Sequence, residues 1–258
     1  MLMSGFESQL KELKSQGFLL LKNALEFEHV VRWREILYGM YENGQYEVHN
    51  SVGNVAFEKL LALQPELSRD LIGHDSVAPF LKFLLGKQCQ LRSLRAHVNP
   101  QSYLQEWHMD FYDYYQQKEK SQGTNPITGL CVNTTFYLTD NPPERGRLRF
   151  LKDFVSVSVP EDIRPHVGYT DDRKNPFQVW CNSQAYVDLH PDAGDLVIFY
   201  SHIPHQGAKL VDDPQGNHRA NIVLHYQQNP MHPEIHFVSD PQFTLDTLGY
   251  ADTFPFSC

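Results

Sequence analysis

Apolar residues in the first ninety positions recur at intervals of three and four, the spacing that predicts amphipathic helices. The first helix carries Phe6, Leu10 and Leu13 on one face, and Gly17 ends it before a short apolar strand over residues 18–21. Further helices are expected over residues 26–42, 56–72 with a possible break at Pro65, and 76–85. Residues 1–90 are therefore predicted to form a mainly helical layer.

From residue 91 onward the pattern changes to short β-branched or aromatic runs, bounded by Gly, Pro, Asn or Asp. These runs cover residues 91–99, 129–138, 185–189, 196–200 and 220–227. Many short strands behind a helical layer predict a mainly β fold with a helical buttress, such as a jelly roll or barrel.

The chain shows no repeat or linker that would divide it, so we expect a single domain over residues 1–258 with its core at 91–230. Residues 160–182 interrupt the strand pattern with charges and prolines, and are expected to be a lid or an insertion.

Charge and cysteine usage narrow the class of protein. The formal net charge is −9, so neither nucleic acid nor an anionic membrane is an expected partner. The four cysteines are scattered, which predicts neither a zinc ribbon nor a disulfide framework. The apolar stretch over residues 17–21 is too short to cross a bilayer. We expect a cytoplasmic protein with free thiols that acts on a small molecule; the sequence leaves the oligomeric state open.

Two His-x-Asp motifs are candidate metal sites: His108-Met-Asp110 and His190-Pro-Asp192. In a strand, positions i and i+2 share a face, so a His and an Asp at this spacing can meet at one ion. Two His and one carboxylate are the usual set for non-haem Fe(II), and they leave positions open for a cosubstrate and oxygen. The second motif leads directly into a turn at Gly194, so His108 and Asp110 are preferred.

A third ligand is predicted beyond the apolar run at residues 196–200. A histidine near the end of this run is followed by a bend that contains Gly207, and the two candidates there are His205 and His202. Arg219 opens the next expected strand, where a guanidinium can hold the distal carboxylate of a dicarboxylic acid through a bidentate pair. Alone, Arg219 would read as an exposed charge; beside the three candidate ligands it indicates a bound carboxylate.

Together these segments resemble the phytanoyl-CoA dioxygenase superfamily, which also contains ectoine hydroxylase and many natural-product hydroxylases. The resemblance is carried by residues 17–24, 107–110, 146–151, 194–207 and Arg219. The chain departs from the family where residues 152–154 replace a Gly-Ser-His turn, and where the gap from His205 to Arg219 is slightly long. Both departures fall in expected loops, so they bear on substrate more than on the metal.

The resemblance implies a double-stranded β-helix, the cupin-like jelly roll, with Fe(II) at His108, Asp110 and His205 and 2-oxoglutarate anchored by Arg219. It favours His205 over His202, because His205 keeps the family's distance from Gly194 and has the following Gly207. Thr135 falls where the family places a second cosubstrate contact, and Asn133 is its rival. The implied reaction consumes O2 and 2-oxoglutarate, releases succinate and CO2, and hydroxylates a C–H bond, as a tailoring step of specialised metabolism. Epoxidation, desaturation or cyclisation stay open as outcomes, whereas Asp110 disfavours halogenation.

Aromatic residues around the first motif suggest a substrate pocket for a polar or cationic small molecule. The candidate substrate contacts are Trp107, Tyr112, Asp113 and Trp180. Packing in the core explains the same aromatic residues equally well.

Two other functions fit parts of the pattern. The three candidate ligands could hold Zn(II) in a hydrolase, although that chemistry gives Arg219 no role and no general base is evident. The chain could also be a jelly-roll binding protein without catalysis, in which the histidines are coincidental. A metal assay separates these two.

Overall fold

Helices come first along the chain, and strands dominate after them. The structure is a computed structural model, and it describes residues 2–49, 55–85, 89–110, 131–154, 158–168, 170–212 and 218–228. The helices are α1 (Leu2–Gln16), α2 (Phe27–Glu42), α3 (Leu60–Leu63), α4 (Pro65–Ile72), α5 (Ala78–Leu85), the 3-10 helix η2 (Arg164–His166) and α7 (Pro176–Ser183). Among the described residues, none of the helices is both long and apolar enough to cross a membrane.

The strands form two antiparallel sheets. The large sheet has the order β1 (Phe18–Leu21), β9 (Leu196–Tyr200), β6 (Cys131–Tyr137), β11 (Arg219–Gln228), β4 (Cys89–Asn99), β3 (Val55–Phe57), β2 (Val48–His49). The small sheet has the order β5 (Tyr103–His108), β10 (His205–Lys209), β7 (Gly146–Leu151), β8 (Tyr186–Leu189). This is the predicted jelly roll, and the fold class is confirmed.

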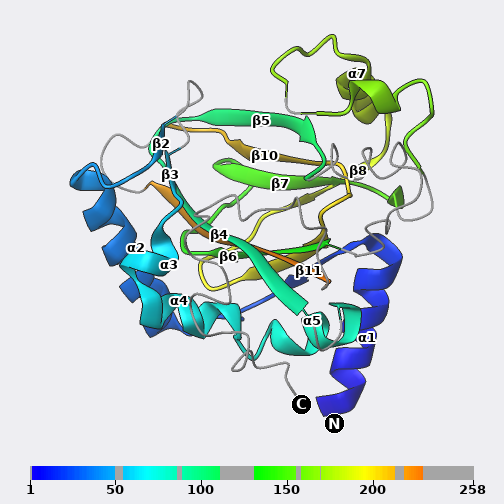
Figure 1. Cartoon of the computed structure of the whole chain (residues 1–258). Coiled ribbons are helices and arrows are strands. Elements are labelled where there is room, and N and C mark those ends of the chain that lie inside the picture. The colour runs from blue at the N-terminus through cyan, green and yellow to red at the C-terminus, as the bar shows by residue number, and fades with distance from the viewer. Residues whose placement is uncertain are drawn as a thin grey trace, which may run out of the picture.

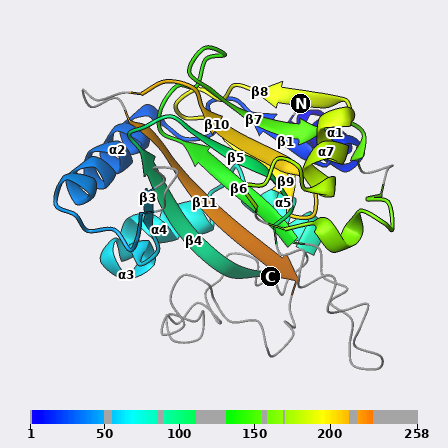
Figure 2. The same cartoon turned by 90° about the horizontal axis from the view of Figure 1, so that it is seen from above.

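The sheets lie over one another, and helices cover the outside of the large sheet. Figure 1 shows the small sheet above the large one, with α2 to α5 below it. Figure 2, turned by 90°, shows β11 and β4 running side by side along their length. This arrangement gives the large sheet one face toward the helices and one toward the small sheet.

Alternation along β11 separates those two faces. Ala220, Ile222, Leu224 and Tyr226 are fully buried, and the Tyr226 hydroxyl donates to the Ile72 carbonyl of α4 at 2.9 Å, so this set faces the helices. The alternate residues of β11 face the small sheet. The residues of β4 and β6 that pair with them lie on the same face, and together they form one continuous, largely polar surface. We call this the inner surface: Ser93, Arg95, His97, Asn99, Asn133, Thr135, Tyr137, Arg219, Asn221, Val223 and His225.

Most of the predicted elements are present. The helix expected over residues 26–42 is α2, and Pro65 opens α4 as the expected break. The prediction that a helix begins at Ala56 is wrong, because residues 55–57 form β3 and pair with β4. That pairing buries Val55 and Phe57 completely, which outweighs the helical spacing of the local sequence.

The segment predicted as a lid or insertion contains η2 and α7. It packs against β5, the edge strand of the small sheet, as Figure 1 shows at the right end of β5. The strand pattern resumes at β8, as expected for residues 185–189.

Candidate metal centre

Three side chains predicted from the sequence converge between the sheets. His108 is the last residue of β5, and His205, the first of β10, lies directly opposite it, while Asp110 follows two residues after His108. The Nε2 atoms of His108 and His205 are 3.9 and 3.5 Å from the Asp110 carboxylate oxygens. One nitrogen or oxygen from each residue lies within 4.8 Å of the others, and all three residues are buried. The structure thus brings the three predicted side chains together.

Each histidine ring is oriented by a backbone carbonyl two residues before it. His108 Nδ1 lies 2.8 Å from the Glu106 carbonyl, and His205 Nδ1 lies 2.9 Å from the Ile203 carbonyl. A carbonyl only accepts, so both Nδ1 atoms carry the proton and both Nε2 atoms present a lone pair. These lone pairs point toward Asp110, and the set fits a divalent cation with bonds of about 2.0–2.2 Å. Gln105 Nε2 lies 3.2 Å from His108 Nε2 and is the group that such an ion would displace.

Asp110 is held by the large sheet rather than by β5. Its backbone N–H donates to the Ser201 carbonyl at 3.0 Å, and Asn133 Nδ2 donates to its Oδ2. Asn133 is oriented in turn by the Ser201 hydroxyl, which donates to its Oδ1. His225 Nε2 also lies 3.7 Å from Asp110 Oδ2, and its Nδ1 is 2.5 Å from the Ser93 hydroxyl. The carboxylate is thereby fixed in a position that the sequence spacing alone did not predict.

The charge states suit a cation. Burial, and next the neighbouring His205 ring, lower the pKa of His108 to about 3, so this ring is neutral at physiological pH. Burial alone would raise the pKa of Asp110, but the rings of His205, His225 and His108 hold it well below its usual range. The site therefore offers a cation one carboxylate, Asp110, and a neutral imidazole, His108.

Arg219 lies at the other end of the inner surface. It is 5% exposed, donates from Nη1 to the Tyr103 hydroxyl, and donates to the Ala208 carbonyl at 3.2 Å. Its guanidinium carbon is 5.5 and 5.6 Å from the ring centroids of Tyr103 and Tyr137. Among the described residues its Nε has no hydrogen-bond partner. A buried cation with neutral partners and a free donor is suited to hold a carboxylate.

Thr135 lies on the inner surface between the two ends. On β6 it is flanked by Asn133 beside Asp110 and by Tyr137 beside Arg219, and it is 4% exposed. Asn133, its rival as a cosubstrate contact, is bonded to Asp110 and so supports the carboxylate.

The α7 segment holds β5 next to the first histidine. The Gln178 side chain accepts from the Trp107 N–H at 2.9 Å and donates to the Trp107 carbonyl at 2.6 Å, and it is fully buried. The Trp107 indole N–H donates to Asn182 Oδ1 at 2.9 Å. Arg173 bonds Glu106 at 2.9 Å. Among the described residues β5 is an edge strand, and Gln178 bonds its backbone as a neighbouring strand would.

The predicted substrate residues are distributed differently from the triad. Trp107 has no exposed surface, and its indole N–H is bonded beneath α7. Trp180 packs on Phe177 and Phe154, with centroids 6.1 and 6.4 Å away. Tyr112 and Asp113 lie outside the described residues.

The rejected alternatives have other roles. His202 stacks on Tyr200, with centroids 5.7 Å apart, and is not among the three converging groups. His190 bonds the Gly146 carbonyl at 2.9 Å, and Asp192 pairs with Lys22 at 2.8 Å.

Several residues of the site escaped the sequence reasoning. His225 and Asn221 follow Arg219 at even spacing on β11, so the period of two would have placed them on its face. Tyr137 follows Asn133 and Thr135 in the same way on β6. Tyr103 and Gln178 gave no comparable signal, since both act across long sequence separations.

A jelly roll with an inward-facing triad of two histidines and one carboxylate combines a cupin-like fold with the ligand set that suits non-haem iron. The model of the phytanoyl-CoA dioxygenase family matches residues 13–210, and the chain belongs to this family. No curated protein matches the sequence at a significant level.

Solved structures with this fold are similar over most of their length. The α-ketoglutarate-dependent epimerase SnoN of nogalamycin biosynthesis, in complex with Fe3+, α-ketoglutarate and nogalamycin RO, matches with a TM-score of 0.65 at 14% identity, over 88% of this chain and 84% of that one. The carbocyclase SnoK from nogalamycin biosynthesis matches with a TM-score of 0.63 at 19% identity, over 86% of this chain and 83% of that one. EctD from S. alaskensis, with 2-oxoglutarate and 5-hydroxyectoine, matches with a TM-score of 0.62 at 16% identity, over 86% of this chain and 75% of that one. These likenesses show the fold.

Proposed function

We propose that this chain is an Fe(II)- and 2-oxoglutarate-dependent oxygenase that hydroxylates a C–H bond of a small molecule. We further propose that residues 1–258 form a single domain and that the protein is cytoplasmic. The observation that carries the proposal is the pairing of the triad with a buried, incompletely bonded Arg219 on one inner surface. Family membership supports the same chemistry. A Zn(II) hydrolase would need the triad but not the arginine.

The chain's own residues divide the work between the two ends. His108, Asp110 and His205 would bind Fe(II) through two Nε2 atoms and one carboxylate oxygen. Arg219 would hold the distal carboxylate of 2-oxoglutarate, with Thr135 as a further contact. Once bound, iron and 2-oxoglutarate supply an oxidant from O2, with release of succinate and CO2.

The surroundings keep the reacting region dry. The aromatic rings of Phe150 and Phe199 lie 6.0 and 4.9 Å from the His205 ring, and both residues are buried. Water is excluded on that side, which strengthens the electrostatic interactions of the triad. Tyr112 and Asp113 are proposed as substrate contacts because they follow Asp110 closely in the sequence.

A tailoring step on a specialised metabolite is the preferred role. Proteins of the same fold include an epimerase and a carbocyclase of nogalamycin biosynthesis, so an outcome other than hydroxylation is the second candidate. Replacing Asp113 by Asn should raise the KM for a polar or cationic substrate if that carboxylate contacts it.

The test is an anaerobic titration of the metal-free protein with Fe(II) and then 2-oxoglutarate, followed by the weak visible charge-transfer band of the chelate. We expect the band in the wild type and its loss in His108→Ala. In Arg219→Ala, a higher 2-oxoglutarate concentration should be needed to produce the band. Tight Zn(II) binding without any band from Fe(II) and 2-oxoglutarate would instead support the hydrolase.

A further inference from the structure

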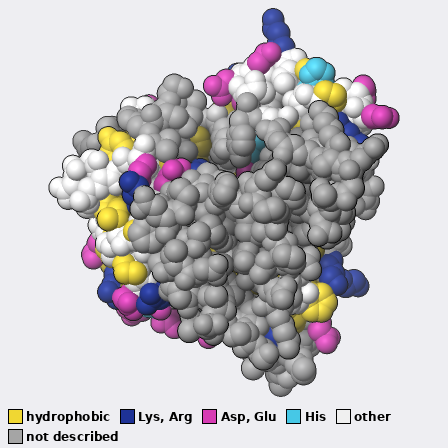
Figure 3. All heavy atoms as spheres, in the orientation of Figure 1, with side chains coloured by type: hydrophobic (Ala, Val, Ile, Leu, Met, Phe, Trp, Pro, Cys, Tyr) yellow, Lys and Arg dark blue, Asp and Glu magenta, His cyan; other side chains and the backbone are white. Residues whose placement is uncertain are grey.

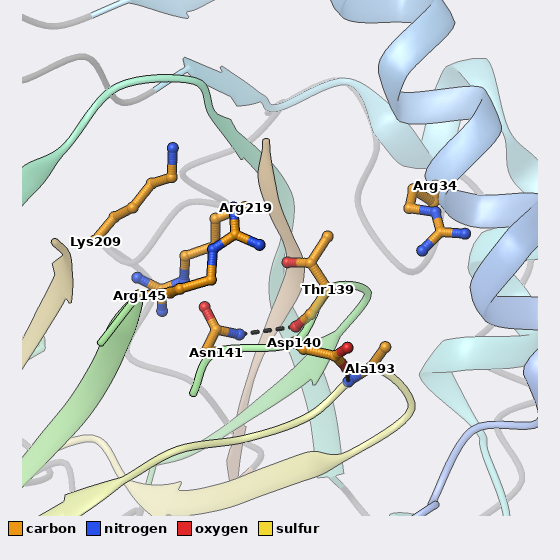
Figure 4. A pocket seen from close by; sticks show the side chains of 8 residues that line it. All are labelled: Arg34, Thr139, Asp140, Asn141, Arg145, Ala193, Lys209 and Arg219. Carbon is orange, nitrogen blue, oxygen red and sulfur yellow. Dashed lines mark hydrogen bonds between the residues drawn. The ribbon is translucent and has the colours of Figure 1, made fainter. Parts of the chain in front are cut away.

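A cavity opens beside Arg219, at the end of the inner surface away from the triad. Its volume is about 240 Å³, and it lies between α2, the loop after β6 and the ends of β10 and β11. The lining residues are Arg34, Thr139, Asp140, Asn141, Arg145, Ala193, Lys209 and Arg219. In Figure 4, Arg145 and Arg219 lie on one side of Thr139 and Arg34, from α2, lies on the other.

Positive charge is concentrated in this cavity. Four of its eight lining residues are basic and one is acidic, although the chain as a whole carries 22 basic and 31 acidic residues. The single acid, Asp140, already accepts the Ala193 N–H at 2.8 Å. Acidic and basic side chains are interspersed on the flank that α2, α3 and α4 form at the left of Figure 3. The charge of the cavity is therefore a local feature.

Three arginines rather than the lysine face the space. The Lys209 ammonium donates to the Pro100 carbonyl at 2.8 Å and extends away from the others in Figure 4. Arg34 is half-buried, and no described residue forms a hydrogen bond or ion pair with it. Arg219 is 95% buried with an Nε that lacks a partner among the described residues. Guanidinium groups gathered this way lower their mutual repulsion by binding an anion.

The frame of the cavity is fixed by hydrogen bonds between its loops. The Asn141 side chain donates to the Thr139 and Pro191 carbonyls at 2.8 and 3.2 Å. The Thr139 hydroxyl accepts the Ala220 N–H at 3.1 Å, next to Arg219. The cavity is thus formed before any ligand arrives, which reduces the entropy cost of binding.

We propose that this cavity binds a small multivalent oxyanion of the phosphate class, contacted by Arg34, Arg145 and Arg219. The proposal of an anion site stands on the cavity alone. Its consequence rests on the proposed function, because Arg219 would then serve both the oxyanion and 2-oxoglutarate. A negative charge beside Arg219 repels the distal carboxylate of 2-oxoglutarate, so each anion should weaken binding of the other.

The first test measures binding of inorganic phosphate to the metal-free protein by calorimetry, at constant ionic strength adjusted with chloride. We expect one phosphate per chain, and affinity at least about tenfold lower in Arg34→Ala and in Arg145→Ala, since each removes a charge-assisted contact. Arg32→Ala is the matched control, because it removes an exposed arginine from the same helix outside the cavity. No heat above the chloride background, or equal affinity in all variants, overturns the site.

The second test measures the 2-oxoglutarate affinity of the Fe(II)-loaded protein with and without phosphate, using the charge-transfer band. Phosphate should weaken 2-oxoglutarate binding in the wild type and in Arg32→Ala, and should have no effect in the Arg34→Ala/Arg145→Ala double variant. Phosphate binding without any change in 2-oxoglutarate affinity overturns the coupling. Absence of the band without phosphate reports instead on the proposed function, so the two failures are distinguishable.

Discussion

The two ends of the inner surface differ in how completely their polar groups are bonded. At the triad, His108 and His205 bond carbonyls through Nδ1, and Asp110 is bonded by Asn133. At the Arg219 end, polar atoms are buried without a partner among the described residues. They are Arg219 Nε, Asn221 Oδ1 and Asn99 Oδ1.

The difference indicates how each end meets its ligand. The triad is arranged in advance, so an ion needs only to displace Gln105 from His108. The Arg219 end carries a cost, because each buried unsatisfied polar group destabilises the fold by about 1–3 kcal/mol. A carboxylate that bonds Arg219 removes part of this cost, and so ligand binding there should stabilise the protein more than contact area alone suggests.

The largest expected effect is the loss of metal affinity when a triad residue is replaced, compared with a replacement at the Arg219 end. His205→Ala should lower metal affinity by more than about 100-fold, since it removes one of three ligands, whereas changes outside the coordination sphere cost about 10–100-fold. Arg219→Ala should leave metal affinity unchanged and weaken 2-oxoglutarate binding about 10–100-fold. Anaerobic calorimetry with Fe(II), then with 2-oxoglutarate, measures both. A large loss of metal affinity in Arg219→Ala would contradict the division.

A smaller effect tests whether α7 belongs to the arrangement of the triad. Gln178→Ala removes both bonds to the Trp107 backbone, so His108 should be less well placed and metal affinity should fall about tenfold. Gln184→Ala is the control, because its side chain bonds only within its own segment.

Co(II) titration of these variants reports the result, and the Co(II) visible spectrum shows whether the coordination geometry has changed. A variant that merely loses thermal stability, with wild-type Co(II) affinity and spectrum, would show that Gln178 is structural only.

The smallest effect is the pH dependence of stability in the metal-free protein. Burial, then Arg95 and Arg219, lower the pKa of His97 to about 3, and burial with His205 does the same for His108. In the unfolded chain both regain a pKa near 6.5, so unfolding takes up protons below that pH. Stability should therefore fall as the pH is lowered from 6.5 toward 3, by at most about 1.4 kcal/mol per pH unit for each histidine.

Urea unfolding between pH 5 and 7 measures this slope. His97→Gln should reduce the slope of unfolding free energy against pH by the contribution of one proton, and the contribution of His108 should remain. An unchanged slope would show that His97 is not protonated more readily in the unfolded chain.

The sequence predicted the triad because its signals are local. His108 and Asp110 are two residues apart, and His205 stands between an apolar strand and Gly207. The reason given for the pair was incomplete, because β5 ends at His108 and Asp110 is placed by the large sheet. β5 itself was missed, since its burial does not alternate. Bulges and edge strands of this kind weaken the period of two.

What the sequence could not predict depends on register. Asn133 was a candidate cosubstrate contact, yet the pairing of β6 with β11 sets it opposite His225 and beside Asp110. Gln178 and Trp107 are separated by 71 residues, and Arg219 and Tyr103 by 116. No periodicity within a segment encodes contacts at such separations, because they follow from how the sheets stack.

The three converging groups are held by two different sheets. His108 and His205 are carried by β5 and β10 of the small sheet, while Asp110 is anchored to β6, β9 and β11 of the large one. An ion bound by all three would cross-link the two sheets, much as a disulfide joins distant parts of a chain. In the metal-free protein, we expect the small sheet to move more freely relative to the large one. Amide hydrogens of β5 and β10 should then exchange faster, while those of β11, paired on both edges, should change little.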